Sequence, residues 1–119
     1  MISYDIIGAA YKVHSALGSG LLESAHEVCL EYELIKMGYK VERQKSLPIT
    51  YEEMKLDAGY RIDLLVEDSI IVELKSVNEM NPLFKAQLMT YLKLSGLTLG
   101  LLLNFNVTDM KKGITRIVM

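Results

Sequence analysis

The spacing of apolar side chains changes along the chain, and each change marks the start of a different predicted element. Apolar residues recur every three or four positions over 6–17 and again over 21–35, which predicts two amphipathic helices. A third pattern with this period covers 83–94. A glycine follows each of the three patterns, as is common where helices end. The sequence therefore predicts two helices near the N-terminus and one in the second half.

Between the second and third helices the apolar spacing shortens to two residues, which is typical of strands. We expect a first strand over 40–51, where Pro48 favours a sheet edge or a bulge. A second strand is expected over 54–66 with an irregularity at 57–59, and a third over 70–77. These three strands would follow one another directly along the chain.

Two further apolar segments follow the third helix. The long run 97–105 predicts a strand at or near the centre of a sheet, and 113–119 predicts a short last strand. The resulting order is two helices, three strands, one helix and two strands. This order predicts an α/β protein in which a mixed β-sheet is flanked by helices.

Composition limits the possible classes of protein. A length of 119 residues suits a single domain over 1–119 with one core. The net charge of −2 excludes a generic polycation, so any nucleic-acid contact needs a local basic patch or a metal. The single Cys29 cannot form an internal disulfide, no run of 18 apolar residues occurs, and acidic Asp5 lies near the N-terminus. We expect a cytoplasmic protein that is neither secreted nor inserted in a membrane.

Charged residues interrupt two of the predicted strands. Glu73 and Lys75 lie within the apolar strand 70–77, and they share a face because alternate residues of a strand point the same way. Asp63 interrupts the preceding strand. A charge in the middle of a buried strand is costly unless it is paired or bound to a ligand. These three residues are therefore candidates for a functional site.

The turn between these strands sets their register. A three-residue turn at 67–69 would pair Val66 with Ile70, and Asp63 would then lie opposite Glu73 on the same face. Opposed Cβ atoms lie roughly 5 Å apart. Two carboxylates at such a separation repel by roughly 1–4 kcal/mol. Mg²⁺ or Mn²⁺ would remove this repulsion, because hard cations bind carboxylate and carbonyl oxygens.

Two interpretations of these charges remain open at this point. In the first, a metal is bound by Asp63 and Glu73 with the backbone carbonyl of Leu74, and Lys75 activates water or stabilises charge on a phosphate. In the second, Lys75 forms a cross-strand ion pair with one of the acids. Acid-x-Lys triplets alone carry little weight, because the chain has three of them: Glu53/Lys55, Glu73/Lys75 and Asp109/Lys111.

Four helical residues are further candidates. Glu23 lies near the start of the second helix, where an acid also favours the helix dipole. His26 follows one turn later, and a lone histidine there is more often a packing residue than a ligand. On the third helix, Gln87 would be a buried amide or a group that positions substrate, and Tyr91 one turn further on is typical of a core residue.

Five motifs, in order and with natural spacing, cover nearly the whole chain: Gly20-Leu-Leu-Glu23-Ser-Ala-His26, Arg61-Ile-Asp63-Leu-Leu-Val66, Ile71-Val-Glu73-Leu-Lys75-Ser-Val77, Ala86-Gln87-Leu-Met-Thr-Tyr91-Leu92 and Leu102-Leu-Asn104-Phe-Asn106. Together they resemble the GxxExxY proteins, a bacterial and archaeal group placed in the PD-(D/E)xK nuclease-like superfamily. The resemblance implies a restriction-endonuclease-like αβββαβ core, here with an extra N-terminal helix.

The resemblance also implies a role for each matching residue. Asp63 matches the first acid of the superfamily motif, Glu73 the second acid and Lys75 the lysine. Glu23 matches a helical acid that often assists the metal. Gln87 and Tyr91 match the motif of the following helix, with Gln87 among the catalytic residues and Tyr91 as a substrate contact.

Two positions depart from the family pattern. His26 replaces the final tyrosine of the GxxExxY name, so a substrate contact or an orienting role at that position would now belong to a histidine. Ile62 replaces the proline of the superfamily name.

The resemblance implies a Mg²⁺- or Mn²⁺-dependent nuclease that hydrolyses phosphodiester bonds, in DNA more than in RNA. The alternative is a catalytically silent nuclease-fold module that binds nucleic acid or a protein partner, which the small size and the net charge favour. A homodimer through an exposed apolar helix face is a third expectation.

Overall fold

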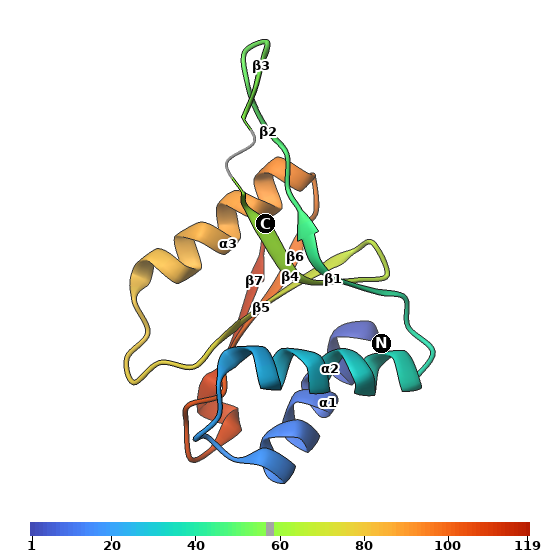
Figure 1. The fold of residues 1–119 in the computed structure, drawn as a ribbon, viewed down its shortest axis with the longest axis vertical. Helices are drawn as coiled ribbons and strands as arrows, with labels where there is room; N and C mark the ends of the chain where they lie inside the picture. The colour runs from blue at the N-terminus through green and yellow to red at the C-terminus, as the bar shows by residue number, and fades with distance from the viewer. Residues whose placement is uncertain (57–58) are drawn as a thin grey trace.

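The computed structural model of the protein describes residues 1–56 and 59–119, and its helices follow the predicted apolar patterns (Figure 1). The helices are α1 (Ile2–Leu17), α2 (Glu23–Lys36) and α3 (Pro82–Ser95), with one short 3₁₀ helix, η1 (Met110–Gly113). Asn81 caps the start of α3 by accepting a hydrogen bond from the Leu83 N–H. Gly96 ends α3 in the left-handed conformation, as the sequence predicts.

A five-stranded mixed sheet forms the centre of the protein. Its strands, in spatial order, are β1 (Val41–Ser46), β4 (Arg61–Val66), β5 (Ile70–Lys75), β6 (Leu99–Asn104) and β7 (Ile114–Val118). Only β5 and β6 are parallel, and α3 connects them across the sheet. The sequence α2, β1, β4, β5, α3 and β6 reproduces the expected αβββαβ order, and α1 is the expected extra helix. The predicted fold class is confirmed.

The helices bury both faces of the sheet (Figure 1). Residues of α1 and α2, among them Ile6 and Leu30, pack with Val72 and Leu101 on one face. Leu88, Tyr91 and Leu92 of α3 pack on the other face, against Ile71 and Leu102. Because β5 and β6 are covered on both sides, their sequences are almost continuously apolar. Glu73 is therefore an exception that needs a physical reason.

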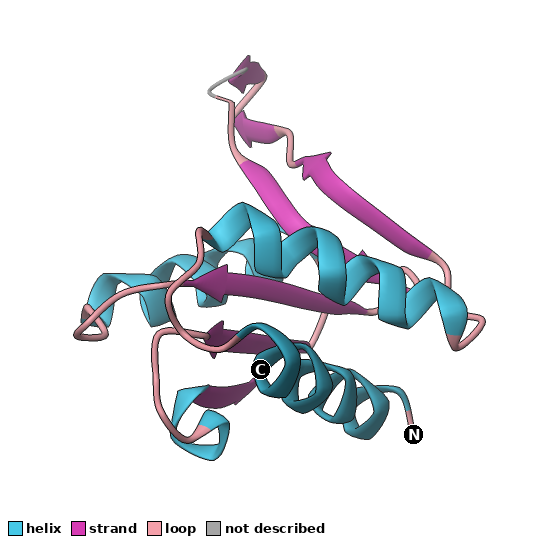
Figure 2. Cartoon of the chain, turned by 60° about the horizontal axis from the view of Figure 1, so that its bottom comes forward, coloured by secondary structure: helices cyan, strands magenta, loops and turns pink. Residues whose placement is uncertain are grey.

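Two predicted strands are each divided in the structure. The segment 40–51 forms β1 and then β2 (Ile49–Tyr51), and the segment 54–66 forms β3 (Met54–Leu56) and then β4. β2 and β3 pair only with each other, as a hairpin that projects from the main sheet (Figures 1 and 2). The prediction of two uninterrupted strands was wrong. Of the irregularity expected at 57–59, positions 57 and 58 lie outside the described residues.

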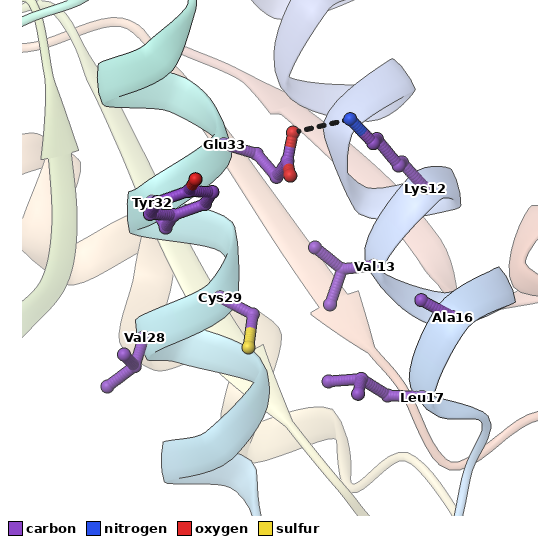
Figure 3. A pocket seen from close by; sticks show the side chains of 8 residues that line it. All are labelled: Lys12, Val13, Ala16, Leu17, Val28, Cys29, Tyr32 and Glu33. Carbon is purple, nitrogen blue, oxygen red and sulfur yellow. Dashed lines mark ion pairs between the residues drawn. The ribbon is translucent and has the colours of Figure 1, made fainter.

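A cavity of about 380 Å³ lies between α1 and α2, and Figure 3 shows the side chains that line it. Its walls are mainly apolar, and the Lys12–Glu33 ion pair, at 3.0 Å, bridges the two helices beside it. None of its lining residues is a predicted site residue. Across residues 1–56 and 59–119, no helix has the length and apolar character that crossing a membrane requires.

Candidate functional site

The carboxylate pair, Asp63 and Glu73, lies where regular pairing of β4 and β5 stops. The strands pair from Val66–Ile70 to Leu64–Val72, which is the register expected from a turn at 67–69. Asp63 and Glu73 are the next residues in this register, so they face each other across the two strands. The predicted register is confirmed.

Each carboxylate of the pair accepts a backbone hydrogen bond from the neighbouring strand. The Asp63 N–H donates to Glu73 Oε2 at 3.2 Å, and the Leu74 N–H donates to Asp63 Oδ2 at 2.9 Å. At this end of the hairpin, hydrogen bonds to the Asp63 and Glu73 side chains therefore replace the backbone hydrogen bonds between β4 and β5. These bonds fix both carboxylates relative to the backbone and so define the geometry of the pair.

Glu73 is strongly perturbed by its surroundings. Glu73 is only 7% exposed. Burial, together with the neighbouring Asp63, raises the pKa of the Glu73 carboxyl to about 9. Without a bound cation, the pair therefore holds a proton at neutral pH. Two acids that cannot both ionise in one site are typical of functional carboxylates, because a cation replaces the proton at little cost.

Lys75 lies on the same strand face as Glu73, and its ammonium group is held by an aromatic ring. The Lys75 Nζ lies 4.4 Å from the centre of the Phe84 ring, at the start of α3. Within the part of the chain that the structure describes, no ion pair joins Lys75 to an acid. The alternative of a cross-strand ion pair is therefore not what the structure contains.

Glu23 approaches the pair from the first turn of α2. Burial raises the pKa of this half-buried carboxyl, the Lys75 charge lowers it, and Asp63 raises it again. A cavity of about 320 Å³ reaches from Glu23 to Asp63, and its lining residues are Leu22, Glu23, Ser24, Glu27, Gln44 and Asp63. Glu23 and Asp63 thus share one opening.

Glu27 belongs to this group, and sequence reasoning missed it. It is 5% exposed, and burial, followed by the charge of Asp63, raises its pKa. Gln44 Nε2 links the two acids, because it donates to Glu27 Oε1 at 2.9 Å and to Asp63 Oδ1 at 3.2 Å. The available signal was the spacing of four residues from Glu23, which places both acids on one face of α2.

His26 does not reach this opening. It is completely buried, its ring stacks on Phe105 with centroids 4.5 Å apart, and its Nε2 lies 3.0 Å from the Gly18 carbonyl oxygen. It directly precedes Glu27, and because consecutive helix residues point in different directions, His26 points to another side of α2, toward Phe105. The expected substrate contact through His26 has no basis in this arrangement, because no atom of the residue is exposed.

Gln87 and Tyr91 lie together on α3. Gln87 is exposed, which corrects the expectation of a buried amide, and its Nε2 donates to the Tyr91 hydroxyl at 2.9 Å. Tyr91 is buried, and its pKa is raised by burial and then by the charge of Glu73. The charge of Glu73 therefore acts on the Tyr91 side chain. Gln87 is linked to the carboxylate pair only indirectly, by its hydrogen bond to Tyr91.

The donor groups suit a hard divalent cation. The two carboxylates provide only oxygen atoms, and Mg²⁺ commonly uses one or two carboxylates and keeps several waters. The Leu74 N–H points to β4, and its carbonyl faces the same neighbouring strand, because the two groups of one strand residue share a direction. Among residues 1–56 and 59–119, no cluster of three or more acid, histidine or cysteine side chains is placed to hold a metal. That the pair and the Leu74 carbonyl bind a metal stays a prediction.

Comparison with protein families agrees with this arrangement. A family model described as the PD-(D/E)XK nuclease superfamily matches residues 1–117. Neither a comparison with curated proteins nor one with solved structures finds a significant match. Because the match spans almost the whole chain and the αβββαβ order is present, the chain belongs to the PD-(D/E)XK nuclease superfamily.

Proposed function

We propose that this protein is a metal-dependent nuclease of the GxxExxY type that hydrolyses phosphodiester bonds, in DNA more than in RNA. The observation that supports this most strongly is the carboxylate pair, in which Asp63 lines a cavity and the buried Glu73 keeps a proton where a cation would otherwise bind. Superfamily membership agrees with the proposal.

Each residue of the site would have a separate role in phosphodiester hydrolysis. Asp63, Glu73 and the Leu74 carbonyl would hold Mg²⁺ or Mn²⁺, which when bound lowers the pKa of water and stabilises charge on a phosphate. Lys75 would orient the attacking water or stabilise the negative charge that develops on the phosphate. Its contact with Phe84 restricts the ammonium group to the side of the strand that carries Glu73.

Glu23 would assist from α2, either through a water on the cation or by orienting the nucleophile. Glu27 and Gln44 would position Asp63, since Gln44 bridges the two acids. Tyr91 would limit water around Glu73 and so maintain its perturbed environment. Gln87 would act on the site only by way of Tyr91.

The test is cleavage of supercoiled, linear and single-stranded DNA, and of RNA, with Mg²⁺ or Mn²⁺. Asp63→Asn should reduce cleavage by about 10²-fold or more, because an oxygen ligand is lost where charge stabilisation matters most. Glu53→Gln is a matched control, because Glu53 is the acid of another acid-x-Lys triplet and lies exposed on the β2–β3 hairpin. Wild-type protein that cleaves none of these substrates would contradict the proposal.

One observation favours a second candidate, a module that binds nucleic acid or protein without catalysis. Among the described residues, no three acid, histidine or cysteine side chains are placed to hold a metal together, although Glu23, Glu27 and Asp63 line one cavity. Calorimetry with Mn²⁺ separates the two candidates, because a module that only binds its partner requires no cation.

We expect the protein to act in the cytoplasm, since Cys29 is its single cysteine. A homodimer stays a prediction, and light scattering on the purified protein tests it.

A further inference from the structure

A third cavity, of about 450 Å³, lies on the other side of the sheet from α1 and α2, between α3 and the base of the β2–β3 hairpin. We call it the aromatic pocket, and its lining residues are Ile49, Tyr60, Leu83, Phe84, Ala86, Gln87, Thr90 and Tyr91. A volume of this size can hold a small organic group. No role assigned to the carboxylate pair uses this space.

The aromatic pocket adjoins the carboxylate pair. Tyr91 lines the pocket and packs against Ile71, on the face of β5 that also carries Glu73 two residues further on. Phe84 lines it too, and Lys75 Nζ lies over the Phe84 ring. A ligand in the pocket would thus lie beside the Lys75 ammonium group, which is proposed to stabilise charge on the phosphate.

The pocket walls suit a flat, uncharged, heteroaromatic ring. Three of the lining residues are aromatic, and among the described residues that line the pocket none is charged. Tyr60 is 44% exposed and lies edge-on to Tyr91 at a centroid distance of 6.3 Å, so Tyr60 offers exposed aromatic surface to a ligand. The Gln87 amide donates to Tyr91, which leaves its carbonyl oxygen to accept from a ligand.

We infer that the aromatic pocket binds an unpaired nucleobase next to the phosphate held at the carboxylate pair. This inference rests on the proposed function and makes its substrate class single-stranded nucleic acid. A base inside a duplex is stacked and paired, so it would reach the pocket only after being unstacked and unpaired. Stacking on aromatic side chains tolerates every base, so the pocket provides strand selectivity without sequence selectivity.

The test is equilibrium binding of a fluorescent mixed-sequence oligonucleotide in EDTA, as single-stranded DNA, as single-stranded RNA and as a DNA duplex. Wild-type protein should bind a single strand more tightly than the duplex, and comparing the DNA and RNA strands shows which sugar is preferred. Tyr60→Ala should weaken single-strand binding by about 5- to 150-fold, the range expected for loss of one stacked base. Tyr60→Phe keeps the ring and should retain the affinity.

A second variant blocks the pocket instead of removing a wall. Ala86→Trp places a large side chain in the pocket from an exposed position of α3 and should also weaken single-strand binding. Met89→Trp is the matched control, because Met89 is exposed on the same helix and does not line the pocket. Thermal unfolding followed by circular dichroism confirms that each variant is folded.

The outcomes separate the inference from the proposed function. Equal affinity for single strand and duplex, or wild-type affinity in both Tyr60→Ala and Ala86→Trp, would overturn the inference even if the protein cleaves duplex DNA. Loss of single-strand binding in both variants would support the pocket even if wild-type protein cleaves nothing. In that case only the nuclease proposal would fail.

Discussion

The behaviour of single residues at this site follows from how they are buried. Glu73 lies in an apolar strand beside Asp63, so burial and a like charge act on it in the same direction. Asp63 accepts hydrogen bonds from both the Leu74 N–H and Gln44, whereas Glu73 accepts one from the Asp63 N–H. Two chemically similar acids thus differ in their environment, and burial is the main cause of the raised pKa of Glu73.

This difference predicts how stability depends on pH. Glu73 has a pKa of about 9 in the folded protein and an ordinary value of 4.5 in the unfolded chain. Between these values the folded state holds a proton that the unfolded state has released. The free energy of unfolding of the metal-free protein should therefore fall as pH rises through this range.

Urea denaturation in EDTA at a series of pH values measures this effect. Glu73→Gln, which resembles the protonated acid, should flatten the profile, whereas the exposed control Glu53→Gln should leave it unchanged. A wild-type profile that rises from acidic to alkaline pH would show that Glu73 is ionised in the folded protein.

A second residue-scale prediction concerns His26. Its ring is fully buried against Phe105, so His26→Ala should lower the free energy of unfolding by about 2–4 kcal/mol. Val28→Ala, at an exposed position of the same helix, should change it by less than about 0.5 kcal/mol. The rate of cleavage per folded molecule should not change in either variant. A lower rate in His26→Ala with unchanged stability would instead point to a role in the reaction.

At the scale of elements, the sequence predicted those features that depend on the pattern of neighbouring residues. The three helices and the β4–β5 register follow from apolar period and turn length, which are properties of neighbouring residues. The β2–β3 hairpin was not predicted as separate, because the alternation of apolar residues is the same whether a strand joins the main sheet or leaves it.

The site shows the same limit. Asp63, Glu73 and Lys75 could be found because they interrupt apolar strands, whereas Glu27 is one charge among many on α2. Its part in the site depends on Gln44, which reaches both Glu27 and Asp63 from β1. Such tertiary contacts leave no periodic pattern in the sequence.

Two glycines provide an element-scale prediction with opposite signs. A methyl group at Gly113, the last residue of η1, would overlap the Asn104 backbone carbonyl, so Gly113→Ala should cost about 3 kcal/mol of stability. Gly8 lies in α1 with open space around it, so Gly8→Ala should add about 0.5–1 kcal/mol. Denaturant unfolding of both variants measures these changes. Equal effects would mean that β7 does not approach β6 as described.

At the scale of the whole molecule, the net charge of −2 limits how nucleic acid can be bound. Few phosphates can be neutralised at once, so affinity should rest on the cation at the carboxylate pair and on base stacking. The logarithm of the association constant for single-stranded DNA should therefore fall with the logarithm of KCl concentration with a slope no steeper than about −3. Fluorescence anisotropy over a salt series measures this slope. A much steeper one would require an extended basic surface that the account does not include.

The most direct test of the central claim is an anomalous difference map from a crystal of the protein soaked with Mn²⁺. The account predicts a peak about 2.0–2.3 Å from carboxylate oxygens of Asp63 and Glu73, a distance close to that of other small hard cations. The Leu74 carbonyl should lie on the same side of the ion. A fully soaked crystal with no peak at these two residues, or with Mn²⁺ bound only elsewhere, would contradict it.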